Sequence, residues 1–485
     1  MNLKKLHILS LVFLLFAGTV CAQPPVVISG TAPFASGEEI RLMVYDDLLN
    51  DIPSLAATDI IDKHGRFTIK YKTADIKAAQ LAIRTSKADI FIVPSVSYDF
   101  AISVDSLLFR TVNPERYGGM LNIRNLNPDT ADLNVKINRF SRFYGALCDN
   151  FSFGLLYGGD PGVYDTIRQN VTSRFPYMYA PENYYLSYIY YTLGGIDLLQ
   201  YKKKNSLVYG KYFDNDNILY NNPAYMALFN QYYSGYLYMS PKISKELLTA
   251  TINEKPDYLT LFNEAGRDPN LANARLRELV IIKNLIEFSE NKEFDKENVL
   301  SLLDYIRKTT SFEIHAKIID NTFADMERKR KPMAEVTFKD EKSRKVSLKH
   351  FEGKPVYLQI FQSDCVDCIR EMAMLKELES KYGEKVQFVS LCIDPEESGF
   401  SSFVRKYKKN FGWPLLYFNQ EYDWLYREGI ETLPDHILFN PDGTVAMRYA
   451  PSPERGLPEF LLMNFSGEEQ QDQNPLFFER NKQQK

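Results

Sequence analysis

Cysteine is scarce in this sequence. The chain has 485 residues and five cysteines, one of which, Cys21, lies close to the N-terminus. The others are Cys148, Cys365, Cys368 and Cys392. Four cysteines in so long a chain do not make a disulfide-rich scaffold, so hydrophobic cores have to stabilise the fold. The length predicts about two to four domains.

Strongly basic segments are lacking as well. The net charge is -4 at pH 7, and no block of Lys and Arg is large enough to form a nucleic-acid binding face. The composition, with 45% hydrophobic and 25% charged residues, is that of a globular protein. Nucleic acid is therefore not an expected partner.

The N-terminal hydrophobic run is too short to span a membrane comfortably. Two lysines precede an apolar run from Leu6 to about Ala17, and small residues follow. This pattern predicts a signal peptide over residues 1–22, cleaved after Ala22, and a periplasmic or cell-envelope location. A lipid anchor on Cys21 is the alternative, but Gly18 stands where a lipoprotein signal has a residue such as leucine.

Residues 23–110 have the pattern of an antiparallel β-sandwich. Seven short segments rich in β-formers are separated by turns. One of the turns, in "DKHGRFTI", has Gly65 at a hairpin position. Seven short strands within about 80 residues are typical of a sandwich.

Residues 111–332 are expected to form an all-α domain. Six segments between residues 130 and 330 carry apolar residues at helical spacing. Five tyrosines in one of them suggest either an aromatic binding surface or packing between helices: Tyr184, Tyr185, Tyr188, Tyr190 and Tyr191. We favour packing, since tyrosine buries its ring and keeps its hydroxyl hydrated. Cys148 is expected to be a buried, small hydrophobic residue.

The run from Glu327 to Val336 predicts a helix end and a domain hinge, because a basic segment and a proline precede strand-like alternation. Residues 333–467 then alternate between strand and helix, which predicts an α/β domain with a βαβ unit followed by a hairpin. Residues 468–485 are polar and are expected to be a disordered tail.

Two cysteines lie three residues apart where a predicted strand changes to a helix. A helix N-terminus stabilises a thiolate at Cys365, and thiolate is the form that attacks a disulfide. Cys368 shares the same helical face, so the two sulfurs can bond reversibly. The spacing predicts an exposed, attacking Cys365 and a more buried, resolving Cys368.

A zinc site and a structural disulfide fit the pair less well. Zinc needs four ligands, and the chain has no second CxxC and no nearby histidine pair, although His350 and His436 could approach in the fold. A structural disulfide over so short a loop would add little stability. Cys392 lies in a predicted core strand and is expected to be a buried packing residue. The alternative is that it is a third redox partner.

The C-terminal quarter of the chain resembles the exported bacterial thioredoxin-like proteins of the TlpA and ResA kind. The supporting segments are "FKDEKSRKVSLKHFEGKPVYLQIF", then CVDC, then "TLPDHILFNPDGTV". The resemblance implies a thioredoxin-like fold, a redox-active CxxC, and a cis-proline at Pro434 with Leu433 contacting substrate. It further implies a membrane thiol-reducing partner and no soluble cofactor. The N-terminal strands resemble the small β-sandwich that precedes such domains.

The resemblance extends to one acid and fails at several positions. Glu371 stands where ResA-like proteins carry a glutamate three residues after the second cysteine, which implies a catalytic role in accepting the proton of Cys368. The alternative is a surface carboxylate paired with Lys376. The departures from the pattern are Asp364 for tryptophan, Val366 and Asp367 without a proline, Gln359 for a buried aspartate, and Asp435 for threonine.

The two aspartates next to the cysteines favour a reducing centre. A carboxylate about 6 Å from Cys365 disfavours its thiolate by about 1 kcal/mol, and a less stabilised thiolate makes the dithiol a better reductant. We therefore expect an exported enzyme that reduces disulfides of exported proteins. The alternative, which the departures support, is a binding or interaction protein whose thioredoxin-like domain is a scaffold without redox turnover.

Overall fold

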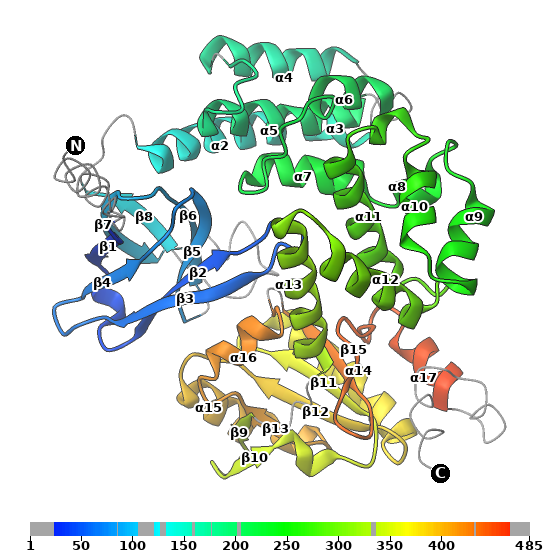
Figure 1. Ribbon diagram of the computed structural model, residues 1–485. Helices are drawn as coiled ribbons and strands as arrows, with labels where there is room; N and C mark the ends of the chain where they lie inside the picture. The colour runs from blue at the N-terminus through cyan, green and yellow to red at the C-terminus, as the bar shows by residue number, and fades with distance from the viewer. Residues whose placement is uncertain are drawn as a thin grey trace, which may run out of the picture.

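The computed structural model describes residues 24–84, 86–104, 121–126, 132–157, 161–175, 177–200, 205–330, 336–430 and 433–465. These residues form a β-rich region, a helical region and a C-terminal α/β domain (Figure 1), which confirms the predicted multidomain architecture. The predicted signal peptide and the C-terminal tail lie outside the described residues. Within the described ranges, no helix combines the length and apolarity needed to cross a membrane.

The sandwich consists of two four-stranded sheets, in the orders β4-β1-β7-β8 and β3-β2-β5-β6. Alternate residues of both sheets point inward and form one core that includes Ile28, Leu42, Leu81 and Phe100. The strands are β1 (Val26–Thr31), β2 (Glu39–Tyr45), β3 (Pro53–Ile60), β4 (Arg66–Tyr71), β5 (Lys77–Ile83), β6 (Ser86–Ile92), β7 (Ser97–Val104) and β8 (Leu121–Asn125).

Two features of the sandwich differ from the prediction. The pair β1–β7 is parallel, whereas the other strand pairs of the two sheets are antiparallel. Strand β8 pairs with β7 although it lies beyond the predicted domain end at residue 110. The sequence did not reveal β8 because β7 ends at Val104 and β8 begins only at Leu121, and pairing at that separation leaves no local pattern.

Several helices of the helical region begin at a polar N-cap residue. Asp132, Asn222, Ser244, Asp257, Asn273 and Asp295 each accept backbone N–H groups of the first turn. The helices are α2 (Leu133–Asn150), α3 (Ser152–Tyr157), α4 (Pro161–Arg174), α5 (Tyr184–Gln200), α6 (Asn205–Tyr212), α7 (Pro223–Tyr232), α8 (Tyr236–Met239), α9 (Lys245–Thr249), the π-helical η2 (Ala250–Glu254), α10 (Tyr258–Ala265), η3 (Pro269–Leu271), α11 (Ala274–Phe288), α12 (Lys296–Thr309) and α13 (Glu313–Arg330).

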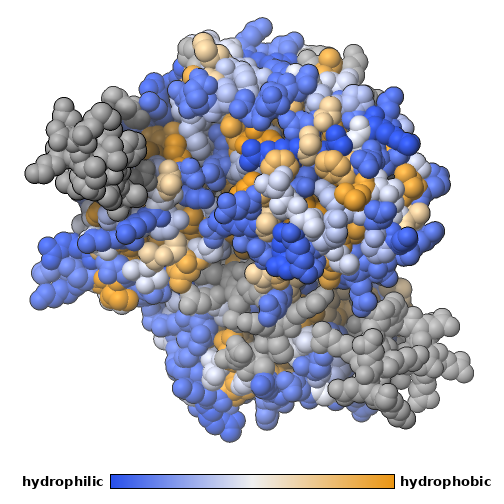
Figure 2. Space-filling view, in the orientation of Figure 1, coloured by the Kyte–Doolittle hydropathy of each residue, from blue (hydrophilic) through white to orange (hydrophobic). Residues whose placement is uncertain are grey.

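The tyrosines of α5 pack between elements, as expected, but two of their hydroxyls bond to the protein backbone, whereas hydrated hydroxyls were predicted from the sequence. Tyr190 and Tyr191 are buried, and their hydroxyls donate to backbone carbonyls near the end of α6. Tyr184 and Tyr188 meet Phe91 of β6 edge to face. Hydrophobic residues on the face of the molecule shown in Figure 2 are scattered among hydrophilic ones, which is normal for a surface in contact with water.

The sandwich is joined to both other regions. The loop after β2 inserts Leu48 and Leu49 into the core of the helical region, and Asn50 exchanges hydrogen bonds with Ile318 and Thr322 of α13. Toward the α/β domain, Arg84 approaches Glu396 at 3.4 Å. These contacts hold the β-rich region against its neighbours (Figure 1).

The C-terminal domain contains a seven-stranded sheet in the order β10-β9-β13-β12-β11-β14-β15. Strand β11 is buried along its whole length, runs parallel to β12 and runs antiparallel to β14. The strands are β9 (Thr337–Lys339), β10 (Lys345–Ser347), β11 (Val356–Phe361), β12 (Gln387–Cys392), β13 (Leu415–Tyr417), β14 (Asp435–Phe439) and β15 (Val445–Met447). The helices are η5 (Leu348–Phe351), α14 (Val366–Tyr382), α15 (Glu397–Tyr407), η6 (Lys408–Asn410), α16 (Tyr422–Arg427) and α17 (Leu457–Phe465).

Candidate redox site

The two cysteines lie at the junction that the sequence predicted. Strand β11 ends at Phe361, and α14 begins at Val366, which makes Cys365 its N-cap residue. The sulfurs of Cys365 and Cys368 form a disulfide with an S–S distance of 1.98 Å. The Cys365 sulfur also accepts the backbone N–H of Cys368 at 3.1 Å, so it receives both a hydrogen bond and the positive end of the helix dipole.

The two sulfur-bearing residues differ in exposure. Cys368 is fully buried, whereas Cys365 is half-buried and has exposed neighbours, Asp364 and Val366. Cys365 is thus less open than the sequence suggested, but it is the more accessible of the two. A nucleophile entering from solvent or a substrate disulfide meets Cys365 first.

The proline predicted beside the cysteines lies at the same end of the sheet. The Leu433–Pro434 peptide bond is cis. Because β14 runs antiparallel to β11, with Asp435 opposite Ile360, the start of β14 lies next to the end of β11 where Cys365 follows. The Leu433 side chain is buried and Pro434 is half-buried.

Glu371 is not a surface carboxylate. It is 4% exposed, and its Oε2 lies 2.8 Å from Nε2 of His436 on β14, which is 5% exposed. The alternative of an exposed acid paired with Lys376 is therefore wrong. Helical spacing places Glu371 one turn beyond Cys368 on the same face of α14.

A second polar network lies beneath Cys368. The Gln359 amide donates to the Cys368 carbonyl at 3.3 Å and accepts from the Ser390 hydroxyl at 3.1 Å. The Trp413 indole donates to the same hydroxyl at 2.8 Å. Gln359 thus holds the first turn of α14 onto the sheet with a neutral side chain, at the position where thioredoxins carry an acid.

The aspartates around the site have different environments. Asp364 and Asp367 are exposed, and Asp367 is bonded to the Arg370 guanidinium one turn along α14, which partly offsets its charge. Asp435 is buried; burial raises the pKa of its carboxyl, and Arg448 at 3.8 Å opposes this shift. Because Arg370 offsets part of the Asp367 charge, Asp364 and Asp367 together destabilise a Cys365 thiolate less than two unpaired carboxylates would.

The remaining described cysteines do not extend the site. Cys392 is fully buried on β12, and burial, reinforced by the nearby Asp394 carboxylate, raises the pKa of its thiol well above the ordinary value. Such a thiol is unreactive. Cys148 is half-buried on α2, and burial raises its thiol pKa as well. In the parts of the chain that the structure describes, three or more metal-binding side chains do not gather at any point.

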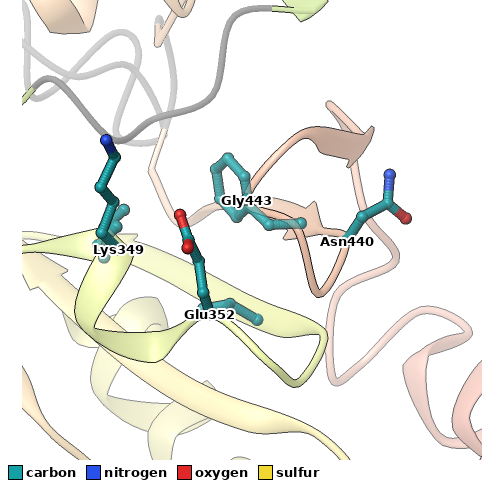
Figure 3. A pocket seen from close by; sticks show the side chains of 7 residues that line it. Lys349, Glu352, Asn440 and Gly443 are labelled. Carbon is teal, nitrogen blue, oxygen red and sulfur yellow. The ribbon is translucent and has the colours of Figure 1, made fainter.

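A small pocket, called the hollow below, lies at the opposite end of β11 from the cysteines. Figure 3 shows Lys349 and Glu352 on one side of it, and Asn440 and Gly443 of the β14–β15 turn on the other. Its floor includes Val356, the first residue of β11, whereas Cys365 follows the last. The hollow is thus separated from the redox site by the length of the strand.

Sequence reasoning missed the partners of the predicted residues. The sequence pattern presents His436 only as a possible zinc ligand and does not single out Ser390 or Trp413. Asp394, which accepts the backbone N–H of Ser363 at 2.9 Å and so fixes the segment before Cys365, was missed too. The one available signal was the polar pair Asp435–His436 directly after Pro434, in a strand that is otherwise apolar.

Comparison with known proteins agrees with this geometry. The Redoxin family matches residues 328–460. The thiol-disulfide oxidoreductase ResA of Bacillus thuringiensis subsp. konkukian is 32% identical over 107 residues, which are 22% of this chain and 60% of that protein. The ResA protein of Bacillus anthracis is 32% identical over 128 residues, or 25% of this chain and 71% of that protein.

Solved structures match the same domain. A thiol:disulfide interchange protein from Bacteroides sp. aligns with 21% identity and a TM-score of 0.25, covering 28% of this chain and 88% of that one. The Redoxin match leaves out the first two regions of the chain, and the chain spans 60% of the length of the first ResA proteins it resembles. Through its C-terminal domain, the chain belongs to the ResA family of thiol-disulfide oxidoreductases.

Proposed function

We propose that this protein is an exported thiol–disulfide oxidoreductase that reduces disulfide bonds of other exported proteins. The observation that carries the proposal is the asymmetric pair at the start of α14: a half-buried Cys365 sulfur that receives a backbone N–H, bonded to a fully buried Cys368. An accessible sulfur at a helix N-terminus with a resolving partner is what disulfide exchange requires.

The exchange proceeds in two steps from the dithiol form. The Cys365 thiolate attacks one sulfur of the substrate disulfide, a mixed disulfide forms, and the other substrate sulfur leaves as a thiolate that takes up a proton. Cys368 then loses its proton to Glu371 and attacks the Cys365 sulfur. The substrate's second thiolate leaves, the protein becomes the disulfide, and the substrate becomes a dithiol.

The charges around the pair support the reducing direction. Asp364 and Asp367 are exposed carboxylates that flank Cys365, and an anionic neighbour disfavours a thiolate. The pairing of Asp367 with Arg370 weakens this effect, and Asp364 directly precedes Cys365 in the chain. A redox titration against glutathione should show a midpoint more reducing than that of glutathione itself.

The remaining assignments follow from family resemblance and from the chain's organisation. Residues 1–22 would direct export to the periplasm or cell envelope, with a lipid anchor on Cys21 as the alternative. A membrane thiol-reducing protein would return Cys365 and Cys368 to the dithiol form. Leu433 and Pro434 would contact the substrate, and the sandwich and helical regions would select or hold the client protein.

Reduction of insulin by residues 23–485, with dithiothreitol as electron donor, tests the activity. We expect the parent protein to reduce insulin and Cys365→Ser to fall to the background rate. Cys392→Ser is the matched control, because its thiol is buried and unreactive, and should retain activity. An inactive but folded parent protein would instead support the alternative, a binding protein that uses the thioredoxin-like domain as a scaffold.

A further inference from the structure

Two residues that face each other across the β11–β14 pair contact the first turns of α14. Gln359 and His436 are directly opposite in the antiparallel register, so their side chains lie on the same face of the sheet. Gln359 contacts the carbonyl of Cys368, and His436 contacts the carboxylate of Glu371, one helical turn further on. The sheet therefore fixes both the resolving cysteine and the acid beside it.

These two sheet residues differ in the protons they can exchange. The Gln359 amide cannot take up a proton, and both ends of it are already engaged, with the Cys368 carbonyl and the Ser390 hydroxyl. His436 can gain or lose a proton at either ring nitrogen. Of these two sheet residues, His436 is therefore the one that can exchange a proton with a side chain of α14.

The surroundings of His436 hold its ring in one plane. Tyr357 of β11 stacks on the imidazole with a centroid distance of 5.5 Å, and its hydroxyl donates to the Pro451 carbonyl. The backbone N–H of His436 donates to the Asp435 carboxylate at 2.7 Å. The other ionisable groups close to the pair are Tyr357, Asp435 and Arg448, and Cys368 precedes Glu371 by one turn of α14.

We propose that His436 is a positioning residue that shares a proton with Glu371, so that the pair accepts the proton of Cys368 in the resolving step. The inference rests on the function proposed above and deepens it. When Glu371 is ionised, Nε2–H of His436 donates to its Oε2. When Glu371 is protonated, the other tautomer of His436 accepts from it, so the same contact supports both states of the acid.

Protons and electrons balance in the resolving step. The Cys368 thiol gives its proton to the Glu371–His436 pair, and the resulting thiolate attacks the Cys365 sulfur of the mixed disulfide. The bond between Cys365 and the substrate breaks, and the substrate leaves with the electron pair as a thiolate. The protein dithiol is oxidised and the substrate disulfide is reduced.

A chromogenic disulfide separates the two steps. The reduced protein, in a Cys148→Ser background, is mixed with excess 5,5′-dithiobis(2-nitrobenzoate), and release of nitrothiobenzoate is followed by stopped flow between pH 5 and 9. Attack by Cys365 releases the first equivalent, and resolution by Cys368 releases the second. General acid–base groups contribute about 100-fold or more, so Glu371→Gln should slow the second phase by about 100-fold and His436→Gln by about tenfold.

The first phase and a matched histidine give the controls. We expect His436→Gln to leave the first phase within about twofold of the parent and to change the pH profile of the second phase. His350→Gln alters an exposed histidine at the other end of β11 and should change neither phase. An unchanged second-phase profile in His436→Gln would overturn the inference, whereas a missing first phase in the parent would instead refute the proposed function.

A second measurement, made on the parent protein, tests the inference without relying on the kinetics of a substituted protein. In the parent protein labelled with ¹⁵N-histidine, the ring nitrogens of His436 should shift between the disulfide and dithiol forms, because the proton on the pair changes with the state of Cys368. The assignment comes from His436→Asn or His436→Gln, whichever is folded by circular dichroism. Identical ring shifts in both redox forms would also overturn the inference.

Discussion

Among the residues that the structure describes, two buried glutamate–histidine pairs stand out, one in the helical region and one in the thioredoxin-like domain. Glu278 of α11 contacts His315 of α13 at 2.7 Å, and Glu371 contacts His436 at 2.8 Å. All four side chains are almost completely buried. The pairs are alike in composition and distance, so their different roles have to come from what surrounds them.

In the helical pair, the Glu278 carboxylate has several hydrogen-bond partners besides His315. Glu278 also accepts from the hydroxyls of Tyr258 and Thr310, and His315 contacts the Tyr220 hydroxyl at 2.7 Å. Burial alone would raise the pKa of Glu278, but the hydrogen bonds from His315, Thr310 and Tyr258 together hold it below its ordinary value. This carboxylate is fixed in its ionised form and ties α10, α11 and α13 together.

The pair under the disulfide has fewer partners. Among the residues that the structure describes, Glu371 has one hydrogen-bonded side-chain partner, His436. It lies one helical turn from Cys368, the buried cysteine that gives up its proton in the proposed resolving step. A buried Glu–His pair is not a functional site by composition; the number of donors around the acid decides whether it is a structural support or a proton acceptor.

Removal of the helical acid should give the largest loss of stability. Glu278→Ala leaves His315, Thr310 and Tyr258 without their acceptor, and breaking a buried pair in this way costs about 3–5 kcal/mol. We expect the unfolding transition of the helices, followed by circular dichroism at 222 nm in urea, to move to lower denaturant by a corresponding amount. The reaction of Cys365 with a disulfide should be unchanged under conditions where the variant is folded.

Glu290→Ala is the matched control for this prediction. Glu290 is an exposed acid in the same region that pairs with Lys296, and exposed pairs contribute about 0–1 kcal/mol. A loss in Glu278→Ala no larger than that of the control would show that the hydrogen-bond network around Glu278 is not a structural support. The proposed difference in role between the two Glu–His pairs would then be wrong.

A smaller loss is expected from the neutral network under the disulfide. Ser390→Ala removes the hydroxyl that the Trp413 indole donates to and that donates to Gln359. Leaving buried polar groups unsatisfied costs about 1–3 kcal/mol. The chain has two tryptophans, Trp413 and Trp424, both in the C-terminal domain, so tryptophan fluorescence in urea reports the stability of this domain.

The comparison variant for this change is Ser380→Ala. The Ser380 hydroxyl is exposed on α14 and donates to a backbone carbonyl of its own helix, so its loss should change the free energy of unfolding by less than about 0.5 kcal/mol. Equal effects of the two substitutions would mean that the Gln359–Ser390–Trp413 network does not stabilise the domain.

The sequence predicted those parts of the site that depend on local spacing. The strand-to-helix junction, the three-residue separation of Cys365 and Cys368, and the position of Glu371 one turn later all follow from a single segment of chain. The partners did not follow, because His436 reaches Glu371 only through the register of β14 on β11, which joins residues 65 positions apart. Short elements such as β13 were missed because three apolar residues have no distinctive period.

The same limit applies to the helical region. Capped, amphipathic helices were predictable from local patterns, whereas the contact between Glu278 and His315 spans 37 positions and two helices. Each residue by itself resembles an ordinary polar residue of an amphipathic helix. Only the tertiary packing of α11 against α13 shows that both side chains are buried and need one another.

The smallest effect concerns two buried carboxylates whose pKa values move in opposite directions. The pKa of Glu278 is lowered by its hydrogen bonds, so the stability it contributes is present above its ordinary value and is lost as the pH falls through the lowered one. The pKa of Asp435 is raised by burial, so the folded protein holds that proton to a higher pH than the unfolded chain does. Its ionisation therefore lowers stability as the pH rises from the ordinary value through the raised one.

The variant Asp435→Asn tests whether ionisation of Asp435 lowers the stability of the thioredoxin-like domain as the pH rises. The asparagine oxygen can still accept the His436 N–H, and Arg448 keeps its contact with the Glu428 carbonyl. We expect the variant and the parent to unfold at the same urea concentration near pH 3, where Asp435 is protonated in both states, and the variant to be more stable at pH 7. Tryptophan fluorescence at the two pH values measures the difference, and Asp367→Asn, an exposed acid, should not show it. A variant less stable than the parent at pH 7 would mean that the attraction between Asp435 and Arg448 outweighs burial, so that both carboxylates would stabilise the fold in their ionised forms.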